Sequence, residues 1–152
     1  MSATTPRLTA AASHTFTQRF SSTRRGARLA RLLAAEQFRT WPVPPGVADR
    51  AEQIVAELAA NAALHGSLQG RDFRLGLVLD PVAGTLRVAV TDARGERSPA
   101  LSVDFGTPPD SESGRGLILV NALADRWGTE PYPPSGKTVW AECATEARRL
   151  PG

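Results

Sequence analysis

Cysteine and long apolar runs are scarce in this sequence, and each scarcity excludes a class of protein. The single cysteine, Cys143, permits no internal disulfide, so we expect a cytoplasmic protein in which this thiol is a small core residue. No run approaches the roughly 18 consecutive apolar residues that a membrane helix needs. Met1–Thr15 lacks the apolar core of a secretory leader. Neither a membrane span nor export is therefore expected.

Aromatic residues and an excess of one charge are also scarce. The net charge is only +3 over 152 residues, and the arginines are spread along the chain rather than gathered in one patch. The nine aromatic residues do not alternate with arginine, as they would on a surface that stacks nucleic-acid bases. No helix-turn-helix with a basic recognition helix is found, so direct nucleic-acid binding is not expected and a DNA-binding protein is the least favoured interpretation.

The composition that remains, 41% hydrophobic and 22% charged residues, is typical of one globular domain. Alternating apolar residues predict strands, and apolar residues at helical spacing predict helices. Strands are expected at residues 14–20, 73–79, 86–90 and 137–143, and helices at residues 24–38, 47–64 and 116–126. This order predicts an α/β two-layer sandwich, in which helices cover one face of a mixed, mostly antiparallel sheet.

The predicted domain spans residues 14–145, between flexible ends at residues 1–13 and 146–152. Residues 93–113 form a long loop, of a length that is usually functional inside a compact domain. The first helix is expected to bury an apolar face and to expose a basic stripe. The apolar face consists of Leu29, Ala30, Leu32, Leu33 and Ala34, and the stripe of Arg24, Arg28, Arg31 and Arg39. The second helix is expected to bury Val47, Ala51, Ile54, Leu58 and Ala62.

The second predicted helix carries a polar pair beside its apolar stripe. Glu57 and Asn61 are four residues apart and therefore lie on one helical face. A carboxylate there could deprotonate a nucleophile, and an amide oxygen could ligate a hard cation such as Mg²⁺. The alternative is a solvated glutamate and an asparagine at a helix end.

Two further segments depart from ordinary strand and loop patterns. Asp92 has the same parity as Leu86, Val88 and Val90, so strand alternation points its carboxylate to the core face, where it needs a donor. Alternatively, the strand has ended and Asp92 caps a turn with Gly95. Ser113–Leu117 places two glycines and Arg115 where the third helix begins, an arrangement that suits phosphate but also describes many flexible hinges.

The order and spacing of these segments resemble the ATP-binding family of gyrase, histidine kinases, heat-shock chaperones and mismatch-repair ATPases. The nearest likeness is to the bacterial anti-sigma-factor serine kinases. Glu57–Gly66 resembles the family's N box, Val90–Gly95 its first glycine box and Gly114–Leu117 its second. Gly136–Trp140 resembles the Gly-x-Thr that opens the last strand. The resemblance covers roughly residues 16–143 and implies a Bergerat-type ATP-binding fold.

The resemblance also implies cofactors, roles and partners. ATP and Mg²⁺ are the implied cofactors, with Glu57 as the general base and Asn61 as the Mg²⁺ ligand. The adenine is expected to contact Asp92 and Thr138. Gly95, Gly114, Arg115 and Gly116 are expected to border the nucleotide. The implied partners are a sigma factor and an anti-anti-sigma protein that is phosphorylated on serine, and the likeness favours a homodimer.

One motif departs from the family pattern. The first glycine box is usually Asp-x-Gly-x-Gly, whereas residues 92–96 read Asp-Ala-Arg-Gly-Glu. This departure keeps a second hypothesis open, that of a nucleotide-dependent partner-binding module without kinase activity. The catalytic piece of a two-component histidine kinase is less favoured, because the chain lacks a dimerising helix pair with an acceptor histidine.

Overall fold

The computed structural model describes residues 12–66, 72–92, 112–133 and 136–146. The elements follow one another as β1 (His14–Ser21), α2 (Arg24–Thr40), α3 (Pro45–Gly66), β2 (Asp72–Asp80), β3 (Thr85–Asp92), α5 (Glu112–Leu123), β4 (Arg126–Tyr132) and β5 (Gly136–Ala144). Nearly all of the two ends predicted to be flexible, and the predicted loop up to residue 111, lie outside the described residues.

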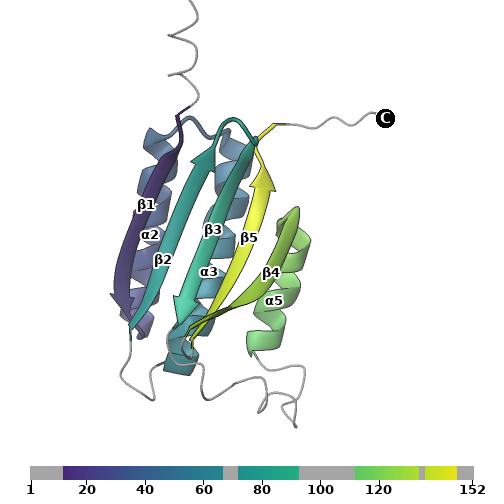
Figure 1. Ribbon diagram of the computed structural model, residues 1–152. Coiled ribbons are helices and arrows are strands. Elements are labelled where there is room, and N and C mark those ends of the chain that lie inside the picture. Colours follow the sequence, from purple (N-terminus) through teal and green to yellow (C-terminus); the bar gives the residue numbers. More distant parts are fainter. Residues whose placement is uncertain (1–11, 67–71, 93–111, 134–135, 147–152) are drawn as a thin grey trace, which may run out of the picture.

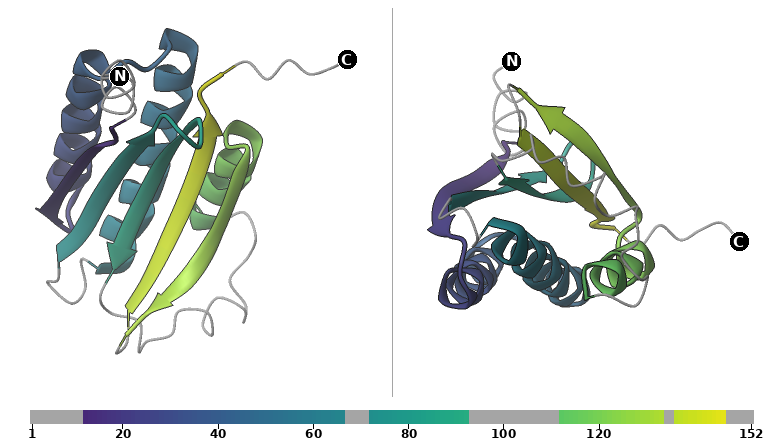
Figure 2. Two further views of the ribbon diagram at one scale, coloured as in Figure 1. Left: turned by 45° about the horizontal axis from the view of Figure 1, so that its top comes forward. Right: turned by 90° about the horizontal axis from the view of Figure 1, so that it is seen from below.

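The strands form one five-stranded sheet in the order β1-β2-β3-β5-β4, and every neighbouring pair is antiparallel. Helices α2, α3 and α5 lie side by side on one face of this sheet (Figures 1 and 2). The predicted two-layer α/β sandwich is therefore confirmed. Among the described helices, none has the length and apolar character that crossing a membrane requires.

The core lies between the sheet and the helices. On β2 and β3 the buried side chains alternate with partly exposed ones, as the sequence predicted. The buried strand residues on the helix side include Phe73, Leu75, Leu77, Leu79, Leu86, Val88 and Val90. Helix α3 packs over them with the predicted stripe of Val47, Ala51, Ile54, Leu58 and Ala62, all of which are buried.

Helix α2 begins as predicted and buries part of the predicted apolar face. The Thr23 hydroxyl oxygen accepts a hydrogen bond from the Gly26 amide at 2.9 Å and caps the helix. The expectation that Leu29 and Leu32 are core residues is wrong, because these side chains are 45% and 57% exposed. The buried face consists of Gly26, Ala30, Ala34 and Phe38, so the two predicted alanines are confirmed, and the predicted Leu33 packs against the core partly buried. Small side chains on this face let α2 approach β1 and α3 closely.

The sequence prediction missed strand β4 and extended the third helix too far. Helix α5 ends at Leu123 rather than at residue 126, and the amide of Asp125 already donates to the Glu142 carbonyl of β5 at 2.8 Å. Gly128 and Pro131 made this strand hard to predict, because glycine and proline are rare in strand interiors. Here β4 is an edge strand that tolerates proline. A Cβ at Gly128 would lie only 3.0 Å from the Trp140 ring, so glycine makes room for the indole.

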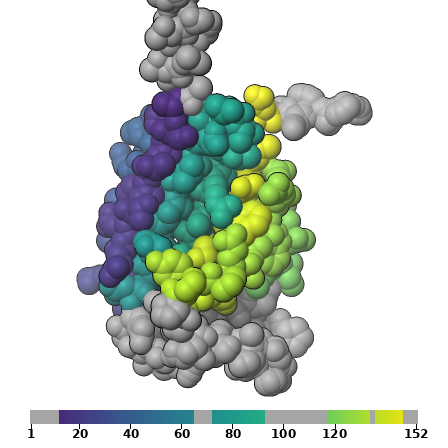
Figure 3. All heavy atoms as spheres, in the orientation of Figure 1, coloured from purple at the N-terminus to yellow at the C-terminus, as the bar shows by residue number. Residues whose placement is uncertain are grey.

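The sheet face opposite the helices is partly covered by β4 itself. Figure 3 shows this face, with β4 curving across its lower part. The Arg74 guanidinium of β2 consequently lies 5.2 Å from the ring centroid of Tyr132, although two strands separate β2 from β4 in the sheet order. On the same face Arg87 and Arg126 both stack on Trp140.

Candidate functional site

The segments that carry the predicted site residues gather at one end of the domain. Figure 1 shows the ends of α3 and β3 beside the beginnings of α5 and β5. This arrangement follows from chain direction, because α3 and β3 run toward that end whereas α5 and β5 start from it. Four segments that are far apart in the sequence therefore come together at this end of the domain.

Glu57 and Asn61 lie on one face of α3, next to the buried stripe. Both side chains are partly exposed, whereas their neighbours Leu58 and Ala62 are buried. The helix runs unbroken through both residues to Gly66, so Asn61 is not at the helix end. The pair is thus held at the border of the core, where it stays accessible to a ligand.

Asp92 is the last residue of β3 and is paired on both sides. It lies opposite Phe73 of β2 and opposite Lys137 of β5. The interpretation that the strand has already ended before Asp92 is therefore wrong, and alternation turns its partly exposed carboxylate toward the helix layer, on the same face as Val90.

Thr138 lies at the same end of the sheet, but alternation places its side chain on the other face from Asp92. Its hydroxyl is hydrogen-bonded to the hydroxyl of Thr91 at 2.8 Å, and these two residues are opposite each other in the β3–β5 register. The sequence analysis missed Thr91, which could be found only once the register between the two strands was known. The structure thus brings Thr138 next to the residue that precedes Asp92.

The glycines of the second glycine box lie inside a helix. Helix α5 begins at Glu112, so Gly114 and Gly116 have helical backbone rather than preceding the helix, as the sequence analysis expected. Glycine adopts this conformation at a cost of about 1 kcal/mol relative to alanine. Gly95 lies outside the described residues, as does the rest of the first glycine box after Asp92.

The donor atoms present suit a Mg²⁺ ion that is held mainly by phosphate oxygens. Within the described ranges, no group of three or more histidine, cysteine or acidic side chains could hold a metal by itself. Mg²⁺ commonly takes one or two protein oxygens together with substrate phosphates. The Asn61 amide oxygen fits that pattern, with Glu57 one helical turn away.

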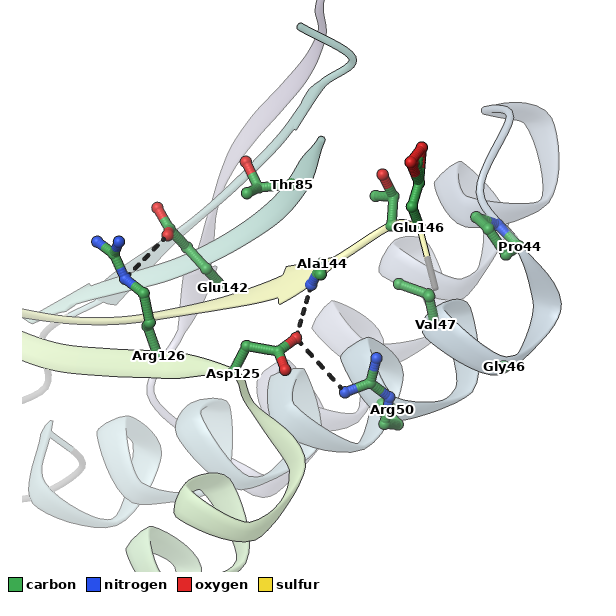
Figure 4. A pocket seen from close by; sticks show the side chains of 11 residues that line it. Pro44, Gly46, Val47, Arg50, Thr85, Asp125, Arg126, Glu142, Ala144 and Glu146 are labelled. Atoms are coloured by element: carbon green, nitrogen blue, oxygen red, sulfur yellow. Dashed lines mark hydrogen bonds and ion pairs between the residues drawn. The ribbon is translucent and has the colours of Figure 1, made fainter. Parts of the chain in front are cut away.

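A second polar cluster lies at the opposite end of the domain, and the sequence analysis missed it. A cavity of about 700 Å³ opens there between the start of α3 and the end of β5 (Figure 4). In its wall Arg50 faces Asp125 at 3.8 Å, and the Asp125 carboxylate accepts a hydrogen bond from the Ala144 amide at 2.7 Å. Burial raises the pKa of the neighbouring Cys143 thiol to about 11, an effect that the Arg50 charge opposes.

Comparisons with solved structures find the same fold in proteins from two bacteria. The structure of the SiaB–SiaC complex from Pseudomonas aeruginosa matches with a TM-score of 0.65 at 10% identity, over 92% of this chain and 95% of that one. The structure of the RsbU and RsbW domains of Rv1364c from Mycobacterium tuberculosis matches with a TM-score of 0.64 at 16% identity, over 86% of this chain and 32% of that one.

Comparisons of sequence give one family and no individual relative. Among curated proteins, no significant match is found. The family described as the histidine kinase-like ATPase domain matches residues 20–142, which include both glycine boxes, the N box and most of β5. The sequence motifs, the sheet with its three helices and this match agree, and the chain belongs to the histidine kinase-like ATPase domain family.

Proposed function

We propose that this protein binds ATP with Mg²⁺ and uses it to phosphorylate a serine of a regulatory partner protein. One observation carries the proposal: the C-terminal half of α3, the end of β3 and the starts of α5 and β5 lie at the same end of the domain (Figure 1), and Glu57, Asn61, Asp92 and the Gly114–Gly116 segment belong to these parts of the chain. These segments offer carboxylates, an amide oxygen and a helix start, which are groups that can bind a nucleotide. Membership of the family indicates that this nucleotide is ATP. A function that consumes ATP also fits the cytoplasmic location that we expect from the sequence.

Each chain residue then has a separate task. Asp92 accepts a hydrogen bond from the adenine amino group, and Thr138 acts on the adenine side indirectly, because its hydrogen bond to Thr91 holds β3 against β5 next to Asp92. Asn61 holds Mg²⁺, which neutralises phosphate charge when it is bound. The start of α5 offers free backbone amide groups to the phosphates, and Arg115 is the residue there whose charge would suit them.

Glu57 is the proposed general base. It takes the proton from the partner's serine hydroxyl while the serine oxygen forms its bond to the γ-phosphorus and the bond to ADP breaks. Phosphoryl transfer of this kind needs positioning and charge neutralisation more than covalent chemistry from the protein. A site that consists of one base, one metal ligand and a glycine-containing helix start is therefore sufficient.

The partner is proposed to be an anti-anti-sigma protein, with a sigma factor as the regulated target. The structural neighbour from P. aeruginosa was solved as a complex of two proteins, which supports a partner for this fold. A homodimer is part of the same proposal. No direct contact with nucleic acid is needed for this function.

A partner surface is proposed on α2. We define the α2 surface as Arg25, Arg28, Leu29 and Leu32, which share one exposed face of the helix. In the predicted basic stripe, Arg31 and Arg39 pair with Glu52 and Glu36. Among the described residues, Arg24, Arg25 and Arg28 have no carboxylate within 4.0 Å. Unneutralised guanidinium groups around two exposed leucines favour a partner segment that is acidic and apolar.

The departure in the first glycine box favours a second candidate function. Arg94 and Glu96 stand where the family has glycines. A binding module that recognises its partner only when ATP is bound would keep Asp92 and Asn61 without using Glu57. This candidate differs from the kinase in one measurable property, the transfer of phosphate.

The deciding experiment measures ATP affinity and phosphate transfer to a candidate anti-anti-sigma protein in the Glu57→Gln variant. If Glu57 is the base, affinity stays within about twofold while transfer falls by roughly 10²- to 10⁴-fold, the usual contribution of a positioned general base. Asp49→Asn is the matched control, because Asp49 is an exposed carboxylate on the same helix. This control should transfer phosphate like the wild type.

Two results would count against the kinase. Transfer at the wild-type rate by Glu57→Gln would remove Glu57 from the mechanism. Partner binding that depends on ATP, without any transfer by the wild type, would establish the binding module instead.

A further inference from the structure

Helix α5 is held by a small set of described side chains between Leu117 and Leu123, and Leu117, Val120 and Leu123 pack against the core. Among its described side chains, Val120 is the buried one, whereas Ile118 is 68% exposed. The Asn121 amide oxygen accepts a hydrogen bond from the Trp127 indole N–H at 2.9 Å. The helix packs chiefly against α3 and makes little contact with the sheet. Contacts with α3 therefore largely decide where its N-terminal glycines lie, and one such contact is polar and lies at the other end of α5.

Arg50 of α3 holds that other end. Its guanidinium donates a hydrogen bond of 2.8 Å to the carbonyl oxygen of Leu123, the last residue of α5. Carbonyls in the last turn have no partner within their own helix and carry the negative end of its dipole, which suits a cation. Asp125, which follows the helix, faces the same guanidinium and is itself fixed to the Ala144 amide of β5 (Figure 4). Arg50 thus joins α3, the end of α5 and the sheet.

This contact sets the register between two antiparallel helices. Helix α3 runs toward the site and α5 runs away from it (Figure 1). Counting forward along α3 from Arg50 and back along α5 from Leu123 at about 1.5 Å per residue, the first turns of α5 lie roughly beside the Glu57–Asn61 turn of α3. A slip of α5 along α3 by a single residue would move its glycine segment by about 1.5 Å. Catalytic geometry tolerates displacements of only about 0.5 Å.

We propose that Arg50 is a positioning residue of the nucleotide site, which fixes α5 on α3 so that the glycine segment faces Glu57 and Asn61. The inference rests on the proposed nucleotide function. Arg50 itself lies about 10 Å along the helix from Glu57 and touches no part of the site. Its effect therefore falls on the phosphate side of the nucleotide, which α5 borders, and not on the adenine side, which the β3–β5 end borders.

The test compares Mg²⁺-ATP affinity with adenosine affinity in Arg50→Ala by calorimetry. ATP affinity should fall by about 3- to 30-fold, the range seen for residues that couple to a distant site, while adenosine affinity should change less than about twofold. Arg50→Lys should recover part of the loss, because an ammonium can still donate to the Leu123 carbonyl. Arg126→Ala is the matched control: this arginine lines the same cavity but pairs with Glu142 and not with α5.

Amide hydrogen exchange supplies a readout that does not depend on nucleotide binding. In Arg50→Ala the amides of α5 should exchange faster, whereas those of β2 and β3 should not. The proposal would be overturned if Arg50→Ala lost ATP and adenosine affinity equally, or if its ATP affinity did not change. Either result would show that Arg50 does not position the phosphate side of the site. If the wild type binds no nucleotide, the proposed function fails. Unchanged exchange of α5 in Arg50→Ala would then show separately that Arg50 does not hold the helix.

Discussion

The junction between β1 and α2 allows a stability prediction with a magnitude taken from the structure. In Gly26→Ala the new Cβ would lie 2.0 Å from the carbonyl oxygen of Ser21 and 2.7 Å from its hydroxyl oxygen. Carbon atoms in proteins pack at about 3.5–4.0 Å, so the junction must open by roughly 1 Å or more. The nearest atom belongs to the backbone and cannot rotate away, so α2 as a whole must move.

The expected loss follows from two opposing effects. Overpacking costs about 1–3 kcal/mol, and alanine's higher helix propensity returns up to about 1 kcal/mol. Taking the middle of each range, the free energy of unfolding should fall by about 1–2 kcal/mol, which lowers the Tm by about 2–8 °C for a domain of this size.

Thermal and denaturant unfolding of two variants measure this loss. Gly46→Ala is the control, since a Cβ there meets no atom within 4 Å at the exposed start of α3. This variant should gain a few tenths to about 1 kcal/mol. If Gly26→Ala is as stable as the wild type or more stable, the close approach of α2 to Ser21 is not a feature of the folded protein.

Three further predictions concern the site and the core. Asp92→Asn should weaken ATP binding by about 1–3 kcal/mol in calorimetry, because its amide NH₂ would oppose the adenine amino group; unchanged affinity would exclude Asp92 as the adenine reader. Asn61→Ala should lower ATP affinity in the presence of Mg²⁺ and leave adenosine affinity unchanged, whereas equal losses would argue against a metal ligand. The folded pKa of Cys143 is raised from 9.0 to about 11, so its contribution to stability is complete below pH 9 and is lost as the pH rises toward 11. Alkaline unfolding of Cys143→Ala should lack this part of the pH dependence, and an identical pH profile in both proteins would contradict it.

Most of the fold could be predicted because its strands and helices follow simple periodic patterns. The alternation of Phe73 through Leu79 and the spacing of Val47 through Ala62 each describe one buried face, and both faces are buried as expected. The first helix misled the prediction in part, because Leu29 and Leu32 are exposed. Burial there is decided by close helix packing, which favours Gly26, Ala30 and Ala34 over larger side chains.

The site could be predicted only in part. Glu57 and Asn61 could be recognised because they are polar residues beside the apolar stripe of a helix. Asp92 could be recognised because strand alternation turns its carboxylate to the face that carries the core residues. Arg50 could not be found in this way, because its hydrogen-bond acceptor lies 73 residues later in the sequence. Strand β4 was missed because edge position, not propensity, allows its glycine and proline.

The central claim is that the gathered segments form an ATP site, and thermal unfolding of the wild-type chain with Mg²⁺-ATP tests it most directly. At a nucleotide concentration of 100 times Kd, binding should stabilise the protein by about 2.7 kcal/mol. For a domain of this size the Tm should then rise by about 5–11 °C. Adenosine should give a smaller rise, and Asp92→Asn should need more ATP for the same shift. A Tm that does not respond to ATP up to millimolar concentrations, with or without Mg²⁺, would contradict the account.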